Sequence, residues 1–304
     1  MKRFLWSAAV TAAAATALAA PSHVLAQDAP TTAPVVDAAA EPEPYDPNPG
    51  ALTLTGGVDW TTAYFFRGYN QDDTGLILQP YATITAALTS NDKFTLNGYV
   101  GTWNSFQSEK TGASGSGPEN WYESDLFGGL DFVFGKFTLG TVYTFYTYPN
   151  GAFSTIQEIG FKVSYDDTDF EKDKLGFALK PYAAIYFETA DANGSEDSYL
   201  EFGIGPTFAA GNVGGKPVTL AVPVVLGCSI DDYYLDSSGD NEFFGYGSVG
   251  LFASIPLGET GKFGAWTLTG GVQFIELFAN SAAVTNDGGK WNEFLGKVGV
   301  SFAY

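Results

Sequence analysis

A long-range alternation of apolar and polar residues is the feature that most constrains how this chain folds. From Leu52 to the end, segments of about ten to sixteen residues alternate along their length, and clusters of Gly, Asn, Asp and Ser separate them. In the first segment Leu54, Val58 and Trp60 share one face, while Thr55 and Asp59 lie on the other. A period of two predicts β-strands with one apolar face. We count twelve such segments, beginning near Leu52, Gly75, Phe94, Asn120, Phe137, Ser154, Leu175, Ser198, Pro217, Glu242, Gly264 and Lys290.

The first fifty residues differ from the rest. Residues 1–26 have a basic start, an apolar stretch and a small-residue cleavage site, which predict a cleaved signal peptide. Residues 27–50 are rich in Pro, Ala and acidic residues without periodicity, which indicates a disordered leader. Residues 51–304 would form a single domain. Removing Lys2 and Arg3 takes the formal charge from −20 to −22, which argues against a nucleic-acid partner.

The only histidine is His23, inside the predicted signal peptide. The mature chain would therefore have no imidazole for hydrolytic catalysis or metal binding. We expect no enzyme, no catalytic residue, no cofactor and no metal site. The acidic stretch from Asp231 to Asp240 lacks the spacing of a calcium loop, and we interpret it as a solvated loop.

The connections between segments alternate in length, though imperfectly. Longer ones cover residues 68–74, 107–119, 149–153, 189–197, 230–241 and 280–289, and shorter ones lie between them. Long loops on one side and short turns on the other are typical of a transmembrane antiparallel β-barrel with short periplasmic turns and longer extracellular loops. Strands in hydrocarbon must pair all their backbone groups, so their sheet must close, and twelve is an even number. The competing fold is a soluble β-sandwich, whose strands are shorter.

Aromatic side chains make up 16% of the chain and cluster at two levels, which predicts two interfacial girdles. The loop-side girdle would contain Tyr64, Phe66, Trp103, Trp121, Tyr146, Tyr199 and Trp291. The turn-side girdle would contain Phe94, Phe134, Phe137, Tyr165, Phe177, Phe208, Trp266 and Tyr304.

Three short stretches resemble the TorF-like family of outer-membrane porins. They are Y-x-F-R-G-x-x-Q from Tyr64 to Gln71, the Gly-x-Trp segment ending at Trp103, and the acidic step Glu123-Ser124-Asp125. The resemblance covers about a third of the chain and implies a bacterial outer-membrane channel whose substrates are poorly defined. The last strand, ending in Tyr304, likewise resembles the signal that the barrel-assembly machinery recognises.

A barrel would place twelve charged residues in its lumen, since a charge facing lipid is costly. These candidate pore-lining residues are Asp59, Arg67, Glu123, Asp125, Asp131, Glu158, Lys162, Lys180, Glu188, Glu201, Glu293 and Lys297. The excess of acids favours a hydrated path with weak cation selectivity; the alternative is a network of ion pairs that fills a narrow barrel.

Arg67 is expected at the outer end of the first strand, beside Glu123 or Asp125. There it would either line a constriction and orient an anionic group of a solute, or serve as a snorkelling or ion-paired girdle residue. Glu123 and Asp125 share a strand face, but this spacing is regular in any strand and does not indicate catalysis.

The sequence therefore predicts a channel for passive diffusion of small hydrophilic solutes or ions, embedded in outer-membrane lipid. The competing functions are a closed barrel with a structural or surface-interaction role and, disfavoured by the missing histidine, a barrel enzyme that acts on lipid.

Overall fold

The computed structural model describes residues 52–91, 93–112, 117–168, 177–190, 197–258 and 260–304. The predicted signal peptide and leader lie outside these residues, as does Leu175, the predicted start of the seventh strand. No helix within the described ranges is long and apolar enough to cross a membrane.

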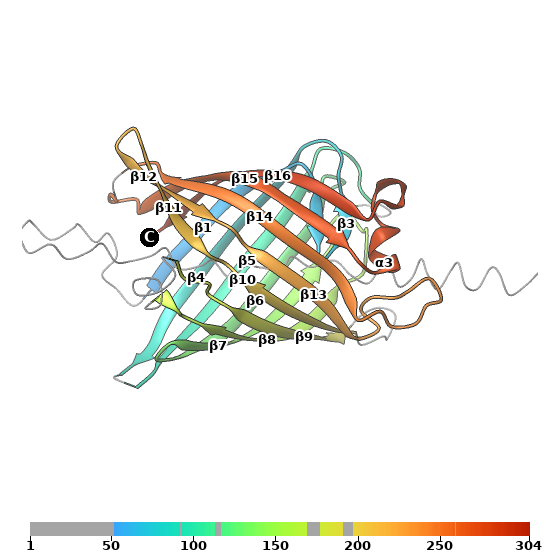
Figure 1. Ribbon diagram of the computed structural model, residues 1–304, viewed down its shortest axis with the longest axis horizontal. Helices are drawn as coiled ribbons and strands as arrows, with labels where there is room; N and C mark the ends of the chain where they lie inside the picture. The colour runs from blue at the N-terminus through green and yellow to red at the C-terminus, as the bar shows by residue number, and fades with distance from the viewer. Residues whose placement is uncertain (1–51, 92, 113–116, 169–176, 191–196, 259) are drawn as a thin grey trace, which may run out of the picture.

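Twelve antiparallel strands form one closed barrel (Figure 1). Eight of them run consecutively as β1 (Leu52–Thr61), β4 (Ile77–Ser90), β5 (Thr95–Gln107), β6 (Trp121–Phe134), β7 (Phe137–Thr147), β8 (Ile156–Tyr165), β9 (Tyr182–Ala190) and β10 (Ser198–Ile204). The others comprise β11 (Thr207–Val213), which continues β10, then β12 (Lys216–Ala221) with β13 (Val224–Asp231), β14 (Phe244–Pro256), β15 (Ala265–Leu277) and β16 (Asn292–Ala303). The first strand pairs with the last through Val58 and Val300, which closes the ring.

Prolines interrupt two of the barrel strands. Pro206 separates β10 from β11, and Pro223 separates β12 from β13. A proline has no N–H to give to a ladder, so a strand bends or breaks there. The carbonyls remain engaged, because Pro206 accepts from the Val222 N–H at 2.9 Å and Pro223 from the Gly250 N–H at 2.8 Å.

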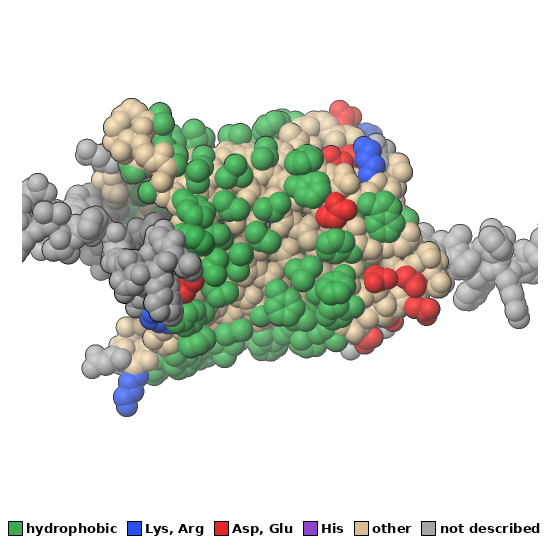
Figure 2. Space-filling model, in the orientation of Figure 1, with side chains coloured by type: hydrophobic (Ala, Val, Ile, Leu, Met, Phe, Trp, Pro, Cys, Tyr) green, Lys and Arg blue, Asp and Glu red, His purple; other side chains and the backbone are tan. Residues whose placement is uncertain are grey.

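The outer face of the barrel is apolar. Leu126 on β6, Val163 on β8 and Val298 on β16 are exposed by 56%, 45% and 45%. Figure 2 shows hydrophobic side chains covering the wall, while most acidic side chains in view gather toward the end that carries the long loops. Such a surface suits hydrocarbon, whereas a soluble sandwich would bury these positions. The barrel prediction is confirmed and the sandwich is wrong.

The first predicted strand is too long. β1 ends at Thr61, and the chain then forms a separate two-stranded hairpin of β2 (Tyr64–Phe66) and β3 (Tyr69–Asp72). Tyr64 and Phe66, predicted on the lipid face, are 4% and 1% exposed. We call residues 62–76 the plug loop, because this segment contacts side chains that face the barrel interior, among them Glu123 and Glu158.

The aromatic residues assigned to the two girdles are arranged differently in the structure. On the turn side, aromatic rings meet in pairs: Phe94 with Phe134, Phe137 with Tyr165, Phe177 with Phe208, and Trp266 with Phe302. On the loop side, Trp121 lies against Phe106, and Trp291 is 45% exposed. Five residues assigned to that girdle are instead buried: Tyr64, Phe66, Trp103, Tyr146 and Tyr199. Tyr64 and Phe66 belong to the plug loop itself, and Trp103, Tyr146 and Tyr199 contact that loop from the inner face of their strands.

Candidate functional site in the barrel lumen

The plug loop turns at its tip through two residues with left-handed backbone. Arg67 has φ of 45° and Gly68 has φ of 84°, and the flanking Phe66 and Tyr69 pair with each other. This is the geometry of a tight two-residue hairpin turn, which favours glycine. A Cβ on Gly68 would lie 2.9 Å from Cβ of Tyr246 on β14, so the tip is packed closely against the wall.

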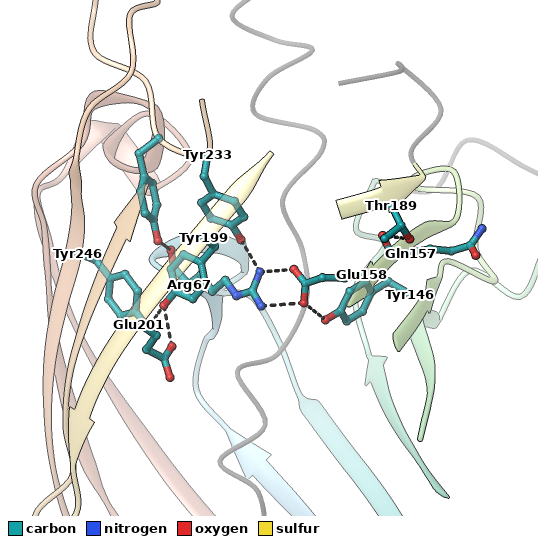
Figure 3. Close-up of polar contacts among 10 residues, drawn as sticks. Arg67, Tyr146, Gln157, Glu158, Thr189, Tyr199, Glu201, Tyr233 and Tyr246 are labelled. Carbon is teal, nitrogen blue, oxygen red and sulfur yellow. Dashed lines mark hydrogen bonds and ion pairs between the residues drawn. The ribbon is translucent and has the colours of Figure 1, made fainter. Parts of the chain in front are cut away.

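Arg67 is held from several sides of the lumen. Its guanidinium donates to both carboxylate oxygens of Glu158 on β8, at 2.6 and 2.9 Å, and to the Tyr233 hydroxyl at 3.3 Å. It also lies 4.3 Å from the ring centre of Tyr186 and 4.2 Å from that of Tyr199. Figure 3 shows the guanidinium between Glu158 on one side and Tyr199 and Tyr233 on the other. Arg67 and Glu158 are both about 3% exposed, so the lumen is occupied at this level.

Two later loops hold the other strand of the hairpin. The Tyr69 hydroxyl donates to the Tyr233 carbonyl at 2.8 Å and lies 2.8 Å from Oγ of Ser281, which belongs to the short helix α3 (Asn280–Ala283). The Tyr234 hydroxyl donates to the Arg67 carbonyl at 2.7 Å, and its ring stacks on that of Tyr69. Burial raises the pKa of the Tyr233 and Tyr234 phenols, so both hydroxyls stay protonated and available as donors.

The stretch from Asp231 to Asp240 is interpreted from the sequence as solvated, but in the structure one part of it is buried. Tyr233 and Tyr234 are 1% and 0% exposed. At its far end Asp236 accepts from the backbone N–H groups of Ser238 and Asp240, which makes a local turn. The burial of this part of the stretch could have been predicted from the adjacent pair of tyrosines, because two large aromatic side chains are seldom left in water together.

The hairpin of β2 and β3 also contacts the barrel strands β5 and β6. The Tyr64 hydroxyl donates to Glu123 at 2.9 Å, and its ring lies 5.3 Å from that of Trp103. The Tyr122 hydroxyl donates to Gln71 at 2.6 Å. Glu123 and Asp125 are 0% and 1% exposed.

One place in the barrel thus brings together the three short motifs singled out in the sequence. Tyr64, Phe66, Arg67, Gly68 and Gln71 form the plug hairpin. The segment ending at Trp103 and the acidic step at Glu123 and Asp125 form the part of the wall that the hairpin contacts. Their convergence assigns them a shared structural role, the fixing of the plug loop.

Two predicted positions are wrong. Arg67 lies at the tip of the plug loop, not on the first strand, and its partner is Glu158 on β8, not Glu123 or Asp125. Arg67 is ion-paired, as one of its two predicted roles requires, but it is buried in the lumen and does not lie in a girdle. Lys180 precedes β9 and has φ of 49°, with its N–H bonded to Asp167, so it belongs to the connection between β8 and β9 and not to a lumen-facing strand position. A hydrogen bond from Thr168 lowers the pKa of the neighbouring Asp166, and Lys180 contributes to that shift.

The remaining predicted residues alternate onto the inner face of their strands. Below the plug loop, Lys297 pairs with Asp59 at 3.4 Å, and Lys162 lies 4.0 Å from the ring centre of Tyr182. Glu201 accepts from the hydroxyls of Tyr182 and Tyr199, at 2.8 and 2.6 Å. The others are Asp131, which approaches Gly140 across the ladder; Glu188, directly opposite Glu158; and Glu293, at the loop end of β16.

A pocket lies in the lumen beside the acidic step. Its lining includes Tyr99, Phe127, Tyr146, Lys162 and Tyr186. Phe127 follows Asp125 by two residues on the same strand face, and Tyr146 is the register partner of Asp125. The pocket therefore adjoins the plug contacts from the inner side.

The chain resembles solved barrels only distantly. The outer-membrane channel COG4313 from Pseudomonas putida F1 shares 11% identity over 88% of this chain and 100% of its own, with a TM-score of 0.44. The NanC porin shares 11% over 83% and 99%, with a TM-score of 0.39. An anion-selective porin from Comamonas acidovorans shares 10% over 83% and 99%, with a TM-score of 0.33.

No protein-family model matches the chain, and no curated protein sequence does.

Proposed function

We propose that this protein is a bacterial outer-membrane channel for passive diffusion of small hydrophilic solutes or ions, and that the plug loop closes it in the state described. The supporting observation is the opposition of the two faces. The outside of the barrel is apolar from β1 to β16, while ionisable side chains on β1, β6, β8, β9, β10 and β16 face inward. A wall of that kind is stable when lipid surrounds it and water or ions reach its inside.

Closure rests on contacts that cross the lumen. The hairpin contacts β8 through Glu158, β10 through Tyr199, β6 through Glu123 and β7 through Tyr146. Conduction would require the hairpin to leave this position. The same contacts favour the second candidate, a permanently closed barrel with a structural or surface-interaction role.

Planar-bilayer conductance separates the two candidates. The channel proposal expects rare openings of the native protein and frequent stepwise openings when residues 63–73 are replaced by a short Gly-Ser linker. Glu293→Gln is the matched control, because it removes a lumen carboxylate outside the plug contacts and should behave like the native protein. A hairpin-deleted barrel that is folded yet silent would support the closed-barrel role.

We also propose that the open path weakly prefers cations. The predicted lumen set, without Lys180, holds eight carboxylates (Asp59, Glu123, Asp125, Asp131, Glu158, Glu188, Glu201 and Glu293) against Arg67, Lys162 and Lys297. Rings of carboxylates select cations in pores. Membership of the TorF-like family is part of this proposal and rests on the plug residues and the acidic step.

A further inference from the structure

Several buried oxygen atoms beside the plug loop have no hydrogen-bond partner within the described part of the chain except, for the two carboxyl groups, each other. They are Oε1 of Glu123, both carboxylate oxygens of Asp125, and Oγ of Ser105. Ser105 and Glu123 are 0% exposed and Asp125 is 1% exposed. Buried polar groups normally find partners, so oxygens left without one in the same place call for a ligand that satisfies them together.

The ladder brings these side chains together. Ser105 on β5 is the register partner of Glu123 on β6, and Trp103 is the register partner of Asp125. Directly opposed residues on one face of an antiparallel pair have Cβ atoms about 4.5–5.5 Å apart. The hydroxyl of Ser105 therefore faces the same small space as the two carboxyl groups, which interact with each other directly.

The local charges do not balance. The nearby cation, Arg67, is engaged by both oxygens of Glu158. Asp125 feels the negative charges of Glu123 and Glu158. Glu123 accepts from the Tyr64 hydroxyl, which is neutral. Two carboxyl groups in contact thus have no nearby counter-charge in a buried site, so either they share a proton or positive charge enters the site.

We propose that Glu123, Asp125 and Ser105 bind one divalent cation, with Ca²⁺ fitting better than Mg²⁺. All the donors are oxygens, which hard cations prefer, and two carboxylates match a charge of +2. The donors stand at positions fixed by two strands; Ca²⁺ accepts irregular coordination, whereas Mg²⁺ demands a near-ideal octahedron. The described residues contain no group of three or more His, Cys, Asp or Glu side chains placed for a metal, so two carboxylates and a hydroxyl are the side-chain donors here.

The bound cation would fasten the plug loop. Tyr64 joins β2 to Glu123, so a cation that orders this carboxylate also orders the hairpin. The lumen pocket lined by Phe127 and Tyr146 lies next to this site, because Tyr146 is the register partner of Asp125. The inference does not depend on conduction, and a protein that binds calcium yet never conducts would leave it intact.

The test is calorimetric titration of the full chain, folded in detergent and freed of metal by a chelator, with CaCl₂, MgCl₂ and NaCl. We expect one calcium per chain, weaker magnesium binding and no saturable sodium heat. Asp125→Asn and Glu123→Gln should each weaken calcium binding at least tenfold, and Ser105→Ala should weaken it a few-fold. Asp59→Asn removes a lumen carboxylate that is paired with Lys297, and should bind calcium like the native protein.

Two results would overturn the proposal: absence of saturable calcium binding by the native protein, or equal affinity in the Asp125→Asn and Asp59→Asn variants. The first would mean that the carboxyl pair shares a proton instead. If Asp125→Asn does not fold, Glu123→Gln and Ser105→Ala decide by the same comparison. Thermal unfolding followed by circular dichroism gives a second reading, since a ligand that binds only the folded state raises the midpoint with concentration.

Discussion

Inside the barrel, Arg67 and Glu158 form a two-point ion pair: the two terminal nitrogens of the guanidinium donate to separate carboxylate oxygens, at 2.6 and 2.9 Å. The pair joins the tip of the plug loop to β8, across 91 residues of sequence. Because both side chains are almost fully buried, each is the main counter-charge of the other.

Arg67→Ala should release the plug loop. It leaves Glu158 as an uncompensated buried charge, and breaking a buried pair in this way costs about 3–5 kcal/mol. We expect more frequent channel openings in planar bilayers and faster proteolysis of the plug loop, with the barrel itself still resistant to heat in detergent.

Arg67→Lys is the informative partner of that variant. Lysine keeps the charge but loses the planar two-point contact and the stacking between Tyr186 and Tyr199. Its opening frequency should fall between those of the native and Arg67→Ala proteins. Identical behaviour of all three proteins would mean that Arg67 does not hold the loop.

Gly68→Ala should loosen the same turn by a different route. The left-handed backbone at this position costs about 1–2 kcal/mol for a residue with a Cβ, and the new methyl would collide with Tyr246. Limited proteolysis of the plug loop measures the effect. Gly135→Ala is the control, because Gly135 also has positive φ, at 57°, but no atom lies within 4 Å of the place where its new methyl would stand; it should leave the plug loop as protected as in the native protein.

Leu126→Arg tests whether lipid surrounds the barrel. Leu126 is 56% exposed near the middle of β6, and an arginine facing hydrocarbon at the midplane costs about 2–4 kcal/mol. Val213→Arg is the matched control: Val213 is 62% exposed but lies at the end of the β11–β12 hairpin, where the cost is about 0–1 kcal/mol. Denaturant titration of the protein folded into vesicles should show the larger loss for Leu126→Arg. Equal, negligible losses would contradict a lipid-facing wall.

Charge changes in the inner lumen should alter ion selectivity in opposite directions. In a hairpin-deleted, conducting protein, Asp131→Asn should reduce the preference for cations and Lys162→Gln should increase it, because each removes one sign of charge from the wall. The reversal potential in a salt gradient measures the change. Glu119→Gln, in an exposed loop pair with Lys110, should leave it unaltered. An anion preference of the parent protein would contradict the selectivity proposal.

The strand pattern itself fixed the barrel. A period of two is a local property of strands. Twelve long segments that each keep an apolar face suit hydrocarbon, where the pairing of all backbone groups requires the sheet to close. For this reason Asp59, Glu158 and Lys297 could be assigned to one face of their strands from alternation alone; in the structure Glu158 is 3% exposed, and Lys297 pairs with Asp59.

What only the tertiary structure decided is how the inside is filled. The sequence from Tyr64 to Phe66 alternates as β1 does, so it reads as more of the same strand, but the turn at Arg67 and Gly68 folds it back into a hairpin. Its partners, Glu158, Tyr199 and Tyr233, come from distant segments. Alternation tells which face a residue occupies, but which inward-facing residues touch depends on strand register and loop path, and these are set by packing across the whole ring.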